Sequence, residues 1–180
     1  IHLCSSHLGQ TVGSEVVHPV FFNFAGKRYF ALDKSGKTTH TNYELTALVV
    51  RELFKNQTDK FKSVDLLCCG TSSPDQIMPS HGVMVHGELK EMNNIEVITP
   101  SGNCCAGMHA LKYSYLAIKS GDKNYAVSTG SERISGILRA THFEQEVKQQ
   151  KILERNPYIA FEKDFLRWML SDGAGAFLLS

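Results

Sequence analysis

Residues 95–107 read IEVITPSGNCCAG, and this stretch predicts a strand that passes through a tight turn into a helix. Residues 95–99 form a short apolar run, and residues 100–103 (PSGN) provide the turn. From Cys105 to Lys119 apolar residues recur three or four positions apart, which is typical of one face of a helix. These periodic residues are Met108, Leu111, Tyr115 and Ile118.

The segments around this stretch alternate between the same two kinds of structure. Residues 64–69 and 124–129 are short apolar runs that predict buried strands. Thr41 and Glu44 have the spacing of a capping box, which predicts the start of a helix over 41–53. Its apolar face holds Leu45, Leu48, Val49 and Leu53. The order strand, helix, strand, helix, strand predicts an α/β fold, with a mainly parallel sheet covered by helices.

Three further segments complete the expected order. Pro79 is expected to open a second helix as its first residue, and this helix runs to about Met92. Residues 136–165 interrupt the alternation with a few apolar residues among many charges, which is typical of a surface helix. The glycines within residues 172–176 are expected to form a tight turn before a final strand.

The composition excludes several classes of protein. Apolar residues make up 42% of the chain and charged residues 21%, which predicts a folded core and excludes a disordered chain. Nineteen basic and 18 acidic side chains leave a net charge of +1, so we expect no nucleic acid partner. No apolar run reaches the roughly 20 residues that a membrane span needs. We therefore expect a cytoplasmic protein without a membrane partner.

Both ends of the chain indicate a part of a longer polypeptide. A length of 180 residues corresponds to about one domain. However, the chain opens on Ile1, and residues 176–180 (AFLLS) have the apolar character of a strand. Native termini are usually polar. We therefore expect residues 1–180 to be one portion of a larger protein.

Five cysteines occur, and four of them form two vicinal pairs, Cys68-Cys69 and Cys104-Cys105. An odd count and vicinal pairing are unfavourable for disulfides, which indicates a reducing compartment. Vicinal cysteines also lack the Cys-x-x-Cys spacing of zinc sites, so no structural metal is expected.

The pair Cys104-Cys105 stands at the first turn of an apolar helix, where a cysteine gains chemical reactivity. Unpaired N–H groups at a helix start stabilise a thiolate, and they can also stabilise an oxyanion on a thioester carbonyl. The small neighbours Gly102, Ala106 and Gly107 leave room for a substrate. Two interpretations stay open from these residues alone, since most free cysteines are simply small core residues.

Six short motifs follow one another in the chain: GTSSPDQ at 70–76, MPS at 78–80, CAG at 105–107, KSG at 119–121, TGSE at 129–132 and SDGAGA at 171–176. In this order they resemble the landmarks of β-ketoacyl-acyl-carrier-protein synthase III and its relatives in the thiolase superfamily. The resemblance covers roughly residues 25–180. It implies the N-terminal half of a thiolase-like fold, with a mainly parallel or mixed sheet and packed helices, and a C-terminal half outside residues 1–180.

This resemblance implies covalent acyl transfer. Cys105 would take an acyl group from a thioester such as acyl-CoA, and its backbone N–H would supply half of the oxyanion hole. Cys104 would be a non-catalytic neighbour. The acyl-enzyme would then undergo decarboxylative Claisen condensation with a malonyl-carrier-protein, in fatty acid or polyketide synthesis. Acyl-CoA and acyl carrier protein are thus the implied substrates and partners, and no cofactor is implied.

Further positions take expected roles from the resemblance. Met78 would reach across a homodimer interface toward the acyl pocket of the second copy; the other interpretation is an ordinary core methionine. Arg28 lies near a basic loop that in relatives helps to hold CoA. The relatives' catalytic His and Asn lie in the second half of their fold. His109, one helical turn after Cys105, is expected to be a solvated or packed side chain.

Two other functions stay open. The chain could be a pairing subunit or scaffold of a synthase, which needs no catalytic His. Alternatively, the vicinal cysteines could form a metal or redox site.

Overall fold

A four-stranded mixed sheet lies at the centre of the described chain, with strand order β4-β3-β5-β6. β3 (Leu66–Gly70) pairs in parallel with both β4 (Glu96–Ile98) and β5 (Ala126–Glu132). β6 (Gly173–Leu179) runs antiparallel to β5, with Gly175 opposite Gly130. The predicted α/β sheet is therefore confirmed, and its one antiparallel pair makes it mixed.

The computed structural model describes residues 10–12, 15–17, 29–56, 58–137, 155 and 170–180. β1 (Gln10–Val12) and β2 (Glu15–Val17) form a separate antiparallel pair. Arg28 lies outside the described residues, as does nearly all of the surface helix predicted over 136–165.

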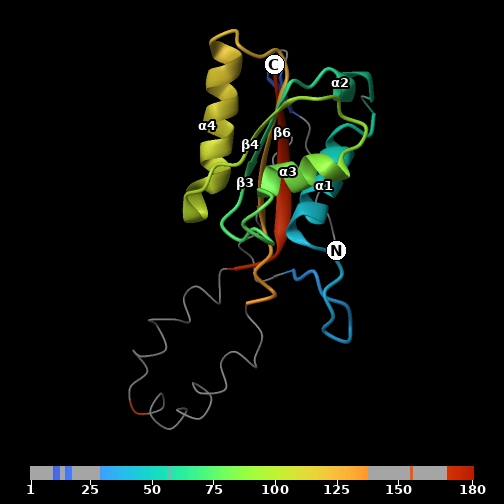
Figure 1. Ribbon diagram of the computed structural model, residues 1–180, viewed down its shortest axis with the longest axis vertical. Helices are drawn as coiled ribbons and strands as arrows, with labels where there is room; N and C mark the ends of the chain where they lie inside the picture. Colours follow the sequence, from blue (N-terminus) through green and yellow to red (C-terminus); the bar gives the residue numbers. More distant parts are fainter. Residues whose placement is uncertain (1–9, 13–14, 18–28, 57, 138–154, 156–169) are drawn as a thin grey trace.

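Helices cover both faces of the sheet (Figure 1). α4 (Ala106–Lys119) lies on one face, and a short 3-10 helix, η1 (Asn103–Cys105), leads into it. α1 (Asn42–Leu53) and α3 (His81–Glu88) pack together on the other face, with α2 (Thr58–Lys62) after α1. None of the helices in the described ranges is both long enough and apolar enough to span a membrane.

The main apolar core fills the space between the sheet and the helices α1, α2 and α3. Strand alternation sends Leu67 and Cys69 of β3 into this core, while Gly70 faces α4 on the opposite side of the sheet. The rings of Phe54 and Phe61 stack in the core with their centroids 4.8 Å apart. Other buried members are Ala47, Val50, Val64, Val85, Leu89, Val127 and Ala176.

The predicted capping box at the start of α1 is confirmed. The backbone N–H of Thr41 donates to Glu44 Oε2 at 2.7 Å, and the backbone N–H of Glu44 donates to Thr41 Oγ1 at 3.4 Å. Leu45 and Val49 are buried as expected, and Leu48 and Leu53 are half-buried. Two free N–H groups are thus satisfied at the helix start.

Three details of the predicted elements are wrong. The second helix begins at His81, because its N-cap Ser80 has extended backbone angles (φ −64°, ψ 156°). Pro79 therefore lies in the preceding turn. The helix ends at Glu88, short of Met92. The glycines of residues 172–176 also form no turn, because they belong to β6 and pair along β5. Glycine permits a turn but does not require one.

Asp172 joins three segments that are distant in the sequence. Its Oδ1 accepts the backbone N–H groups of Ile134 at 2.6 Å and Ser135 at 2.8 Å, and its Oδ2 accepts that of Ala31 at 2.7 Å. The carboxylate is buried, so these bonds replace the water that it loses. The end of β5 and the start of β6 are therefore held at one point.

His81 is a buried polar residue that connects three elements. Only 1% of its surface is exposed at the start of α3. Its Nε2 lies 3.3 Å from Thr46 Oγ1 of α1 and 3.1 Å from Ser131 Oγ of β5. Burial lowers the pKa of His81 below its ordinary value of 6.5, since the core disfavours the imidazolium. The native protein therefore holds His81 neutral.

This burial predicts that acid weakens the fold before the carboxylates titrate. As pH falls through 6.5, the unfolded chain takes up a proton on His81 more readily than the native chain, whose His81 pKa is lowered by burial, so the free energy of unfolding falls as pH falls. Urea unfolding at about pH 7.5 and about pH 5.5 measures the effect, which His81→Gln is expected to reduce. An equal pH dependence in the wild type and His81→Gln would show that His81 is not the cause.

Candidate functional site

The turn between β4 and α4 places Cys105 at the surface. Gly102 and Asn103 have φ angles of +152° and +50°, which lie in the region that glycine and asparagine tolerate best. The backbone N–H of Cys105 donates to the Gly102 carbonyl at 3.0 Å, which closes the turn as η1. The strand, turn and helix predicted from residues 95–107 are therefore confirmed.

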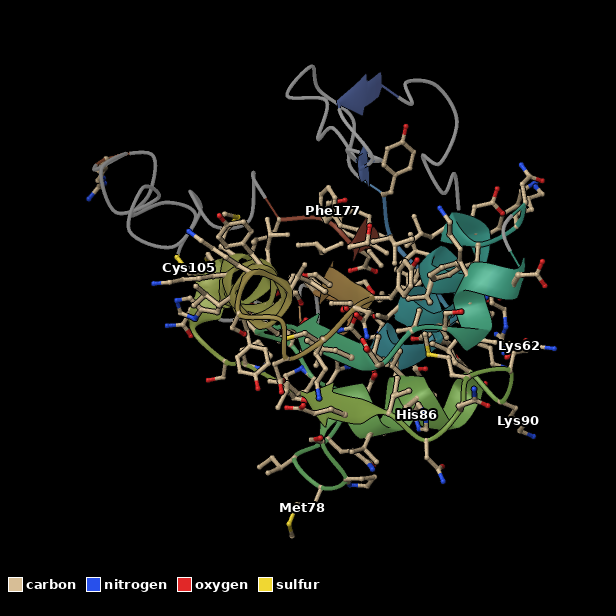
Figure 2. The ribbon with its side chains drawn as sticks, turned by 90° about the horizontal axis from the view of Figure 1, so that it is seen from above. Lys62, Met78, His86, Lys90, Cys105 and Phe177 are labelled. Atoms are coloured by element: carbon tan, nitrogen blue, oxygen red, sulfur yellow. The ribbon has the colours of Figure 1, made fainter. Side chains whose placement is uncertain are left out.

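The two vicinal cysteine pairs have opposite environments. Cys104 and Cys105 are both exposed free thiols, and Figure 2 shows Cys105 at the edge of the molecule where α4 begins. Cys68 and Cys69 lie fully buried in β3, and burial raises the pKa of both thiols to about 12. The interpretation of Cys104 and Cys105 as core residues is thus wrong; it describes Cys68 and Cys69 instead.

Glycines allow the start of α4 to lie directly on the sheet. A Cβ atom added to Gly70 would stand 2.2 Å from the Ala106 carbonyl oxygen, so the β3 backbone touches the first turn of α4. A Cβ atom on Gly107 would come within 3.3 Å of the Gly130 Cα in β5. This close contact fixes the height of Cys105 above the sheet, since Cys105 directly precedes Ala106.

The helix face that contacts the sheet is made of small residues. Ala106, Ala110 and Ser114 are the buried members of α4. Two of the periodic apolar residues, Met108 and Tyr115, are instead exposed by 64% and 52%. Their spacing correctly predicts a helix but does not mark the face that the sheet covers.

A polar cluster holds the loop after β3 against the end of β5. Glu132 accepts the backbone N–H of Ser72 at 2.7 Å, the Ser72 hydroxyl at 2.7 Å and the Ser73 hydroxyl at 2.5 Å. The ion pair between Arg133 and Asp75, 3.2 Å apart, lies beside it. Glu132 ends β5, and the loop residues follow β3, so the parallel pairing of these two strands brings them to one sheet edge. Their place in the 70–76 and 129–132 motifs did not predict this cluster.

Met78 lies at the tip of this loop. Its side chain is 84% exposed, and that of the neighbouring Ile77 is 89% exposed. The interpretation of Met78 as a core methionine is therefore wrong. Figure 2 shows Met78 pointing away from the molecule, at a different edge from Cys105. A single copy of the chain thus does not bring these two predicted site residues together.

His109 is exposed on α4, and its ring folds back toward the turn before Cys105. His109 Nδ1 lies 3.0 Å from the Ser101 carbonyl oxygen, so the side chain is packed against the turn as well as solvated. Within the described ranges, no group of three or more His, Cys, Asp or Glu side chains could hold a metal ion.

Comparison with known proteins gives sequence relatives over part of the chain. No family model matches. β-Ketoacyl-[acyl-carrier-protein] synthase III from Anaplasma marginale is 30% identical over 115 residues, which are 64% of this chain and 29% of that protein. The protein of the same name from Limosilactobacillus reuteri is 30% identical over 95 residues, 53% of this chain and 29% of that protein. The matches thus span less than a third of these relatives.

Solved structures share the fold at lower identity. A tetronic acid condensing enzyme superposes with a TM-score of 0.63 at 19% identity, over 84% of this chain and 39% of that chain. β-Ketoacyl-[acyl-carrier-protein] synthase III from Thermus thermophilus superposes with a TM-score of 0.58 at 17% identity, over 81% of this chain and 38% of that chain. OleA from Xanthomonas campestris superposes with a TM-score of 0.57 at 18% identity, over 77% of this chain and 40% of that chain. The described chain therefore has a thiolase-like fold and covers less than half of each structure.

The contact between β3 and α4 predicts that Gly70→Ala destabilises the protein. A Cβ atom at Gly70 would lie 2.2 Å from the Ala106 carbonyl oxygen, so α4 must move away from the sheet. We expect the free energy of unfolding to fall by about 1–3 kcal/mol or more in urea titrations.

Gly87→Ala is the matched control for this substitution. Gly87 lies in α3 with nothing within 4 Å of an added Cβ atom, so alanine is expected to stabilise the helix by up to about 1 kcal/mol. Equal stability of Gly70→Ala and the wild type would contradict the close approach.

Proposed function

We propose that this chain, which is ketoacyl synthase III-like in sequence and thiolase-like in fold, carries the nucleophile of a condensing acyltransferase. The main support for this proposal is the position of Cys105, which is an exposed free thiol at the start of α4 within the CAG motif of residues 105–107. Cys68 and Cys69 cannot serve, because burial raises the pKa of their thiols to about 12.

In the first proposed step Cys105 becomes acylated. Its thiolate attacks the carbonyl carbon of an acyl thioester such as acyl-CoA, and a tetrahedral oxyanion forms. When this intermediate collapses, the bond to the donor sulfur breaks and the donor leaves as a thiolate, which takes up the proton that the Cys105 thiol had lost. The product is an acyl-Cys105 thioester. The exposure of Cys105 supports this step, because a thioester needs access to the sulfur.

The oxyanion would accept a hydrogen bond from the backbone N–H of Cys105. That N–H donates to the Gly102 carbonyl at 3.0 Å in the free chain. The proposed role therefore requires the N–H to be shared between two acceptors or to leave Gly102 when the substrate binds.

The second proposed step is condensation with a malonyl-carrier-protein. Loss of CO2 from the malonyl group gives a carbanion equivalent, which attacks the acyl carbonyl carbon and expels the Cys105 thiolate. The names of the relatives include acyl carrier protein, which supports a carrier-bound extender. We assign the groups that promote decarboxylation to the part of the fold outside this chain, because the chain covers 39% of the tetronic acid condensing enzyme.

Met78 supports the proposal of a homodimer. Ile77 and Met78 place two almost fully exposed apolar side chains side by side at a loop tip. Burial of one such side chain contributes about 1.5–3 kcal/mol, so a pocket on a second copy would stabilise a dimer.

Arg28 as a CoA contact stays a prediction. The two free thiols, at Cys104 and Cys105, fit a reducing, cytoplasmic setting.

Acylation of Cys105 is the direct test of this function. After incubation with an acyl-CoA, we expect peptide mass spectrometry to show one acyl group on Cys105, lost in Cys105→Ala. Cys104→Ala is the matched control and is expected to keep the label, because the Cys104 thiol is also exposed but precedes the CAG motif. Label on Cys104 alone, or no label in the wild type, would refute the proposed nucleophile.

The dimer proposal predicts a change of oligomeric state in Met78→Asp. A buried charge in place of methionine should weaken association by at least about tenfold in sedimentation experiments. Lys90→Asp places the same side chain at another exposed site and should leave association unchanged. A monomeric wild type, or a fully dimeric Met78→Asp, would exclude Met78 from the interface.

A further inference from the structure

The His109 side chain links the body of α4 to the turn that carries Cys105. Its Nδ1 lies 3.0 Å from the Ser101 carbonyl oxygen. The ring also lies against Gly102, since a Cβ atom added there would stand 2.6 Å from both Cε1 and Nδ1 of the ring. One side chain therefore contacts two successive turn residues, one by a hydrogen bond and one by packing.

The direction of this hydrogen bond is set by its acceptor. A carbonyl oxygen only accepts, so Nδ1 of His109 must carry the proton and donate it to Ser101. Both the imidazolium and one neutral tautomer have a proton on Nδ1. The contact therefore holds in either protonation state, which suits a structural connection better than a pH switch.

A second hydrogen bond connects the same turn to the nucleophile. The Gly102 carbonyl accepts the backbone N–H of Cys105 at 3.0 Å. His109 thus holds Ser101 and Gly102 from the helix side, and Gly102 in turn holds Cys105. The three contacts form one closed unit between the end of β4 and the second turn of α4.

This turn depends on such a restraint because its own backbone is easily moved. Ser101, Asn103 and Cys104 are exposed, so little packing holds them. Gly102, at φ +152°, lacks the side chain that would restrict its backbone. A change in this turn would rotate Cys105 away from the N–H groups that favour its thiolate.

We propose that His109 is a positioning residue for Cys105, which acts by donating from Nδ1 to Ser101 and by packing on Gly102. This inference rests on the proposed function, in which Cys105 is the nucleophile. His109 itself takes no part in the bond changes. Its role is to keep the thiol in its reactive orientation before the substrate arrives.

Alkylation of Cys105 by iodoacetamide, followed by peptide mapping, tests this role without any acyl donor. We expect His109→Ala to slow modification of Cys105 about threefold to tenfold, which corresponds to the net strength of one hydrogen bond. His109→Asn should restore most of the rate, because its Nδ2 stands at the same number of bonds from Cα as Nδ1 and can donate to Ser101.

His86→Ala is the matched control. His86 Nε2 lies 3.0 Å from the Asn93 carbonyl oxygen, so the variant loses the same kind of contact at the same distance, on α3. Figure 2 shows His86 far from the edge that holds Cys105, and we expect an unchanged rate. A wild-type rate in His109→Ala, or an equally slow His109→Asn, would overturn the proposal.

Alkylation and acylation also separate this inference from the proposed function. Failure of acyl-CoA to label the wild type would count against the proposed function alone, since alkylation does not depend on it.

Discussion

The backbone contact between Gly70 of β3 and Ala106 of α4 is the constraint on which the site depends. No side chain separates strand and helix at this point, and Gly107 and Gly130 repeat the arrangement one strand further along. Only glycine on the strand and a small residue on the helix allow this approach. This contact positions Cys105, because the next residue, Ala106, lies directly against the sheet.

The same constraint explains the unusual distribution of apolar residues on α4. A helix this close to a sheet has room for only alanine and serine on the contact face, and Ala106, Ala110 and Ser114 occupy it. Larger apolar residues must therefore lie elsewhere, and Met108, Tyr113, Tyr115 and Leu116 are exposed. These four residues therefore leave an apolar surface on α4 outside the face that contacts the sheet.

The sequence predicted the features that depend on local chemistry. The capping box at Thr41 and the turn before Cys105 were both predictable, because each is specified by a few neighbouring residues. Features that depend on tertiary packing were not. The start of α3 after Pro79, the pairing of residues 173–176 along β5 and the burial of His81 all depend on distant partners. The exposure of Met78 also needed the fold, since methionine suits a core equally well.

Asp172 makes the end of the sheet depend on one charge. Its carboxylate ties Ile134 and Ser135 to the start of β6, so the chain leaves the sheet and returns to it at the same point. The same carboxylate also accepts the backbone N–H of Ala31, so it faces three donors with two acceptor oxygens. An amide of the same shape keeps one acceptor oxygen and turns a second donor toward these N–H groups, so the ionised acid is what this corner of the fold requires.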